Sequence, residues 1–224
     1  MGDLILNVLP YGLAAAAAAP IVVVVTALIL AKSKRPLLSA WVFTAGAAAL
    51  DVAFTAVLLG AANASGAFEG GGSEGGAIVD VVLGAVFLAI GIRAIFSSES
   101  PDQQASQRER IERAAAGGLR GMLITGIVAQ VINIDALTVF TGAIKEAAEA
   151  DVSTPQAVVA LGIALAVMLI PYYLPAVLYA LSPRRSAPLL REMSDWLLDH
   201  SRMLEIVVGI GFGAIFLIKG IASL

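Results

Sequence analysis

Six apolar runs divide the chain, and each is long enough to cross a lipid bilayer as an α-helix. About 20 largely apolar residues span the hydrocarbon core of a membrane. Only 14% of the residues are charged and 59% are hydrophobic, whereas a soluble domain carries about 25% charged residues. The sequence therefore predicts an all-α integral membrane protein with one domain, residues 1–224. The runs cover residues 4–31, 36–60, 77–96, 119–144, 156–181 and 203–222.

Positive charge is confined to alternate connections between these runs. Three basic connections hold 12 of the 14 Lys and Arg residues, and the two other connections hold only Lys145. Because loops rich in Lys and Arg stay in the cytoplasm, we expect a multi-pass protein with both termini outside. The N-terminus lacks the basic segment of a signal peptide, so we expect the first run to be retained.

The residue types that common catalytic and metal sites need are scarce. The chain has no Cys and a single His, His200, which excludes disulfides, thiolate metal sites and multi-histidine metal centres. It has no Ser-His-Asp arrangement and no phosphate-binding loop. The sequence therefore predicts a protein that is not an enzyme, with no cofactor, no metal and no nucleic-acid partner.

The fourth run carries Gln130, Asn133 and Asp135 near its middle. An acid at the centre of a spanning helix costs roughly 2.5–3.5 kcal/mol, so we expect it to face protein or water. On an ideal helix Asp135 points away from the side of Gln130 and Asn133. We therefore expect a local break near Asn133, or else a helix that contacts protein on two sides. Gln130 and Asn133 are predicted to bind polar groups of a substrate or to cap opened backbone.

Two earlier runs also contain features of a substrate path. Pro20 in the first run predicts either an ordinary kink or a discontinuous helix whose freed backbone faces the substrate. In the second run, Thr44, Asp51 and Thr55 share one stripe at helical spacing, and such a stripe should face the bundle interior. Pro20 and Thr44 are predicted substrate contacts. Asp51 is either a functional acid or a structural one that a neighbouring helix satisfies.

The fifth run and the segment after it have more ordinary interpretations. Pro171 and Pro175 predict a kink towards the inner end of the run, and Tyr172 and Tyr173 are interpreted as interface anchors rather than substrate contacts. Residues 186–200 place apolar side chains on one face and charges on the other, which is typical of an interfacial helix on the cytoplasmic surface.

Charged residues near two helix ends are candidates for an ion pair. Asp80 is expected near the outer interface, where water solvates it. Lys219 is interpreted as a snorkelled anchor or as a partner for Asp51 or Asp80. Glycines on the third and sixth runs form faces for close helix contact, which allow a homodimer without requiring one.

The six runs divide into two halves of three. The first half is residues 1–97, the second is residues 118–224, and a cytoplasmic linker over residues 98–117 joins them. Because basic connections alternate with the others, the two halves have opposite orientations in the membrane. Inverted halves of this kind are a recurrent plan of secondary transporters.

One spacing supports the inverted repeat. Gly12 precedes Pro20 by eight residues, and Gly126 precedes Ile134 by the same eight. Each half therefore has its irregular element in its first helix, where transporters of this plan form their sites. We predict two inverted three-helix repeats.

Four parts of the chain carry a resemblance to a known family. They are the proline-containing first helix, PLLSAWVFTAG at residues 36–46, LGAVFLAIGIRAI at residues 83–95, and the last third from LYALSPRR at residue 178 to the Lys-Gly near the C-terminus. They resemble the LysE superfamily of six-helix exporters, most closely its GAP-like branch of Sap and peptidoglycolipid-addressing proteins. That branch commonly has Asn-Pro-Lys in the fourth helix, where this chain has Asn133-Ile134-Asp135. Asn133 carries over, but the proline is lost and an acid stands in place of the cation.

The resemblance implies a function in transport. It implies a secondary exporter that moves a cell-envelope lipid or glycolipid outward across a bacterial cytoplasmic membrane by alternating access. Asp51 and Asp135 are the predicted proton-coupling groups, because protonation of a buried carboxyl group can favour one conformation over another. The expected partners are membrane lipids and the substrate.

Two other functions stay open. The wider superfamily implies export of an amino acid or other small cationic solute, which two buried acids would suit. A non-transporting scaffold subunit of an envelope-assembly complex is an alternative of a different class. Its glycine-rich helix faces and its surface helix would then be contacts for partner proteins.

Overall fold

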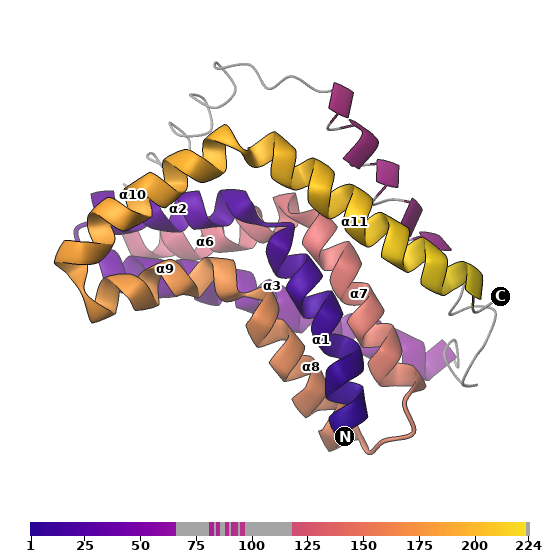
Figure 1. Ribbon diagram of the computed structural model, residues 1–224. Coiled ribbons are helices and arrows are strands. Elements are labelled where there is room, and N and C mark those ends of the chain that lie inside the picture. The colour runs from indigo at the N-terminus through magenta and orange to yellow at the C-terminus, as the bar shows by residue number, and fades with distance from the viewer. Residues whose placement is uncertain are drawn as a thin grey trace.

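The computed structural model is built from helices, and no strand occurs in the residues that it describes (Figure 1). It describes residues 1–65 and 118–222 and, between them, residues 81–82, 84–85, 88–89, 91–93 and 95–96. The predicted linker and Asp80 lie outside these residues. The prediction of an all-α protein is confirmed for the described part of the chain.

One described helix is long and apolar enough to cross a membrane by itself, and three more spans result if each bent pair of helices counts as one. The single helix is α3 (Pro36–Ser65), 30 residues long, which begins at a proline directly after a basic loop. These helices identify a membrane protein. The bent pairs are α1 (Gly2–Ala17) with α2 (Pro20–Lys32), α6 (Gly118–Ile132) with α7 (Ile134–Glu149), and α8 (Thr154–Met168) with α9 (Ile170–Leu181).

The three bends have different local causes. Helices α1 and α2 meet at 62°, and α2 begins at Pro20, a position where a missing N–H is tolerated. Helices α6 and α7 meet at 75° at Asn133, where the sequence predicts a break. Helices α8 and α9 meet at 66° at Leu169, two residues before Pro171, so a bend occurs beside the first of the two prolines that predicted a kink.

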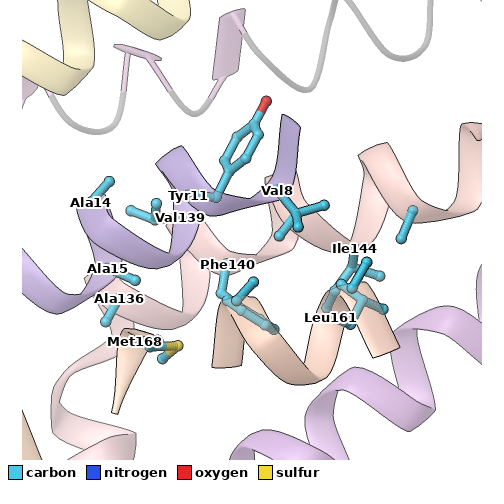
Figure 2. Packing of buried hydrophobic residues seen from close by; sticks show 14 of the residues in the cluster. Val8, Tyr11, Ala14, Ala15, Ala136, Val139, Phe140, Ile144, Leu161 and Met168 are labelled. Carbon is cyan, nitrogen blue, oxygen red and sulfur yellow. The ribbon is translucent and has the colours of Figure 1, made fainter. Parts of the chain in front are cut away.

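The bends divide the bundle into two packed regions. In the first, α1 packs against α7 and α8 (Figure 1). Its core is made of small and aliphatic side chains around Phe140, with Tyr11 of α1 at one side (Figure 2). In the second region, α2 and α9 pack against each other and against α3. The core of the second region includes Val22, Ile29, Phe43, Ala47, Met122, Leu169 and Tyr172.

Helices α3 and α6 cross in close contact, and glycines make the crossing possible. A Cβ atom on Gly126 would lie 2.0 Å from the carbonyl oxygen of Phe43, and one on Gly46 would lie 2.2 Å from that of Leu123. Only a residue without a side chain fits at either position, since small residues let helix backbones approach. This crossing holds the first half of α3 against the middle of α6.

Helix α10 (Pro183–Asp199) covers the ends of α2 and α9. It begins three residues before the predicted start at residue 186, at Pro183. Leu190 is buried against the bundle, whereas Leu189 and Trp196 are exposed. The predicted amphipathic helix is therefore present. It packs on the bundle through Leu190 and leaves Leu189 and Trp196 on an exposed apolar surface.

Helix α11 (Ser201–Ala222) meets the described residues of 81–96 through glycines. Cβ atoms on Gly84 and Gly91 would lie 2.6 Å and 2.9 Å from the backbone nitrogens of Leu217 and Ile210. The glycine faces of these two segments therefore contact each other within one chain. A homodimer through such faces stays a prediction.

Candidate functional site

Three polar side chains from three helices meet inside the bundle. Gln130 on α6 donates a hydrogen bond through Nε2 to Asp51 Oδ1 on α3, at 2.7 Å. The hydroxyl of Tyr172, at the start of α9, donates to Gln130 Oε1. Asp51 and Gln130 are 0% exposed and Tyr172 is 1% exposed. This Asp51–Gln130–Tyr172 cluster is the candidate functional site.

The sequence places each member of the cluster through a different local feature. Asp51 belongs to the predicted stripe on α3, and Thr44, two turns earlier, is buried with it. Gln130 lies in the last turn of α6, directly before the break at Asn133. Tyr172 follows the bend at Leu169 and Pro171, which turns the start of α9 into the bundle.

Two threonines join the same place through the backbone of α9. Thr26 on α2 and Thr44 on α3 each place Oγ1 3.3 Å from the carbonyl oxygen of Tyr172. Each hydroxyl is also 3.0 Å from a carbonyl of its own helix, on Val22 and Ala40 respectively. Hydroxyl groups that link helices in this way hold a polar region together inside an apolar bundle.

Among the residues that the structure describes, two buried polar atoms in this region have no hydrogen-bond partner. They are Oδ2 of Asp51 and Nδ2 of Asn133. The Asn133 side chain approaches the Tyr172 hydroxyl, but as the residue before α7 it makes no capping bond. Buried polar groups are normally hydrogen-bonded, and an unpaired one costs about 1–3 kcal/mol. In the described part of the chain, an unpaired acceptor and an unpaired donor therefore lie beside two bends.

The structure brings some of the predicted site residues together and separates others. Gln130, Asn133 and Asp51 lie in one region with Thr44, as described above. Asp135 is half-buried and lies near Arg93 rather than in the cluster. Helix α2 begins at Pro20. Substrate contacts of Pro20 and Thr44 stay predictions.

The predicted ion pair falls on residues whose side chains the structure does not describe. Asp80 lies outside the described residues, and of Lys219 only the backbone, within α11, is described. The pairing of Lys219 with Asp80 therefore stays a prediction. Among the residues that the structure does describe, no three His, Asp or Glu side chains are grouped in a way that could hold a metal ion.

Tyr172 is the main residue that the sequence interpretation missed. The prediction of an interface anchor is wrong for this tyrosine, because its side chain is almost fully buried and stacks on Phe43, with ring centroids 5.5 Å apart. Its hydroxyl belongs to the polar cluster instead. The available signal was its place between Pro171 and Pro175, because prolines inside a spanning helix free backbone groups that need polar neighbours.

Comparison with known families gives a match that covers nearly the whole chain. A family model described as Sap, sulfolipid-1-addressing protein, matches residues 8–222. No curated protein and no solved structure gives a significant match. The match includes all three members of the cluster and confirms the Sap part of the resemblance, while the assignment to the LysE superfamily stays a prediction. The chain belongs to the family of the Sap, sulfolipid-1-addressing protein.

Proposed function

We propose that this chain is a secondary exporter that moves a lipid or glycolipid of the cell envelope outward across the bacterial cytoplasmic membrane, in exchange for protons. The matching family is described as sulfolipid-1-addressing protein, and this description supports a lipid as the class of substrate. The observation that carries the proposal is Asp51, an acid without exposed surface that Gln130 holds beside two broken helices.

Two halves of opposite orientation would supply the two states of alternating access. The helix crossings support this plan. Gly12 on α1 approaches the carbonyl oxygen of Ala164 on α8, where a Cβ atom would lie 2.6 Å away. Gly126 on α6 approaches Phe43 on α3 in the same manner. The first helix of each half thus crosses the second span of the other half, which is the reciprocal pairing that an inverted repeat produces.

Asp51 is the residue to which we assign proton coupling. Desolvation penalises the charged form of a buried carboxyl group. Gain or loss of one proton therefore strongly changes the free energy of the conformation in which the group is buried. A conformational equilibrium can follow such a change. Asp135 is a second coupling candidate, because it is half-buried, interacts electrostatically with Arg93 and lies in the first turn of α7, the second helix of the broken α6–α7 span.

Lipid movement by the purified full chain tests the proposal. Proteoliposomes would contain a sulfated glycolipid with an NBD fluorophore, and dithionite would bleach the label that reaches the outer surface. With a pH gradient, we expect the wild type to move label faster than protein-free vesicles. Asp51→Asn should slow this movement at least about tenfold, equivalent to about 1.4 kcal/mol in the barrier. Asp3→Asn, at an exposed position near the N-terminus, is the matched control and should move label like the wild type.

Each outcome bears on a different part of the proposal. Wild-type movement no faster than in protein-free vesicles would overturn lipid export. Lipid movement that is the same with and without the pH gradient, or the same in the wild type and Asp51→Asn, would contradict proton coupling. Either result would still be consistent with lipid transport. Equal folded yields of the variants, measured by size-exclusion chromatography, separate a loss of transport from a loss of protein.

A further inference from the structure

A row of polar side chains leads from Asp51 to the break between α6 and α7. Asp51 accepts from Gln130, Gln130 accepts from the Tyr172 hydroxyl, and Asn133 lies beside that hydroxyl. The two ends of the row carry the unpaired atoms, Oδ2 of Asp51 and Nδ2 of Asn133. The row therefore ends in unused hydrogen-bonding capacity on both sides.

The hydrogen bonds in this row all run in one direction. Tyr172 donates to the oxygen of the Gln130 amide, and this leaves the amide nitrogen to donate to Asp51. A carboxylate accepts hydrogen bonds only, so this direction suits an ionised Asp51. A carboxyl group protonated on Oδ1 points an O–H donor at the Gln130 nitrogen, which cannot accept it.

We propose that protonation of Asp51 reverses the direction of this row and thereby carries the state of the acid to the α6–α7 break. A proton delivered from water binds Oδ1 of Asp51, the oxygen that faces Gln130. The Gln130 amide makes a half-turn, so its oxygen accepts from the new O–H and its nitrogen donates to the Tyr172 oxygen. The Tyr172 hydroxyl keeps its own proton and turns it to the amide oxygen of Asn133, which turns to accept it. One proton is added and no other covalent bond changes.

The reversed row adds a hydrogen bond at the break between α6 and α7. Asn133 gains a hydrogen bond from Tyr172, and it is the residue at which α6 ends and α7 begins. Its backbone carbonyl accepts from Ala136 N at 3.1 Å, in the first turn of α7. A new bond on its side chain therefore acts on the residue that sets the 75° angle between the two helices. Gln130 and Tyr172 are positioning residues in this scheme.

Several titratable or charged side chains lie on the helices that pack against α3. Tyr172 interacts with the Asp51 carboxyl group. The others in the described part of the chain are Lys32 on α2, Arg120 on α6, Asp135, Lys145, Glu146 and Glu149 on α7, and Tyr173 and Tyr179 on α9.

The inference rests on the proposed proton coupling but is tested without transport. Infrared difference spectra between acid and alkaline pH would be recorded on the full chain in lipid nanodiscs. The carboxyl band that Asp51→Asn removes reports Asp51, and the tyrosine band that Tyr172→Phe removes reports Tyr172. In the wild type we expect both bands to change over the same pH range. In Gln130→Met the new side chain is similar in size but cannot link Asp51 to Tyr172 by hydrogen bonds. We therefore expect the pH-dependent change of the tyrosine band to be lost, while the carboxyl band of Asp51 still changes with pH.

Tyr173→Phe is the matched control, because it removes the neighbouring hydroxyl on the same helix. It should leave both bands and their coupling as in the wild type. A tyrosine band that does not follow Asp51 in the wild type would overturn the relay, and so would coupling that survives Gln130→Met. An Asp51 band that does not titrate at all would overturn it as well. Lipid movement in the vesicle assay is measured separately, so failure of the relay leaves the proposed export standing.

Discussion

The first broken helix and the second one share a geometry and differ in chemistry. Helices α1 and α2 meet at 62° around Ala18 and Ala19, and α6 and α7 meet at 75° around Asn133. In each pair a glycine lies eight residues before the first residue of the second helix and contacts a backbone carbonyl of another helix. The first break is lined by alanine, whereas the second lies beside Gln130 and the cluster.

This difference shows that the cause of a helix bend and the function of the residues at the bend are separate matters. The alanine-lined break shows that a bend of this size needs no polar side chain where neighbouring helices hold both parts. At Asn133 the polar groups instead reach another span, because Gln130 contacts Asp51 directly. The two halves thus repeat an architecture, and the candidate chemistry is concentrated in the second break. Three sets of substitutions test this separation.

The largest effect is expected from Gly126→Ala. The new methyl group would lie 2.0 Å from the Phe43 carbonyl oxygen, so α3 and α6 must separate along their crossing. We expect a loss of at least about 3 kcal/mol of stability, the upper end for overpacking, measured by thermal unfolding in detergent. Gly12→Ala should lose less, because its methyl group would lie 2.6 Å from Ala164 O. Gly162→Ala is the control, since nothing lies within 4 Å of its Cβ position; equal melting temperatures for all three would contradict the crossing.

A pair of proline substitutions tests whether α7 begins at Ile134, directly after the break. Ile134 is the first residue of α7, and Asn133 before it has φ −81° and ψ 48°, outside the helical region. A first helical position tolerates proline, so Ile134→Pro should change the stability by less than about 1 kcal/mol. Val128→Pro, inside α6, should cost about 3 kcal/mol because it removes a helix hydrogen bond. Equal losses for the two variants, by the same unfolding measurement, would mean that the helix continues through Asn133.

The smallest effect on stability is expected from Asn133→Ala, which makes the second break resemble the first. The Asn133 nitrogen is buried without a partner and the side chain caps nothing. Its removal should therefore leave the stability unchanged or raise it by up to about 1 kcal/mol. Lipid movement in the vesicle assay should nevertheless fall. Unfolding of this variant would show that Asn133 is a structural residue, and normal movement would remove it from the site.

Much of the site could be anticipated from patterns within single segments. The stripe of Thr44 and Asp51 predicted that the acid faces the interior, and both residues are buried. The disagreement in direction between Gln130 and Asp135 predicted the break at Asn133. These predictions succeeded because helical periodicity and the cost of lipid-exposed polar groups act on each helix alone.

Contacts between helices were harder to anticipate. Tyr172 looked like an interface anchor because an aromatic residue in an apolar run usually fits that role. Its burial depends on the 66° bend at Leu169, which redirects α9. The close contact at Gly46 was not predicted either, since a lone glycine does not indicate which helix packs against it. Neither residue carries a local pattern that names its neighbour.

The lengths of the apolar runs, the alternation of basic loops and the prolines were enough to predict a helical membrane protein with broken spans. Those features act within about 30 residues, the length of one span, where geometry follows directly from residue type. The contact of Asp51 with Gln130 joins residues 79 positions apart, and that of Gln130 with Tyr172 joins residues 42 apart. Such pairs form only when bent helices pack at close crossings, and the packing of the whole bundle selects which side chains meet.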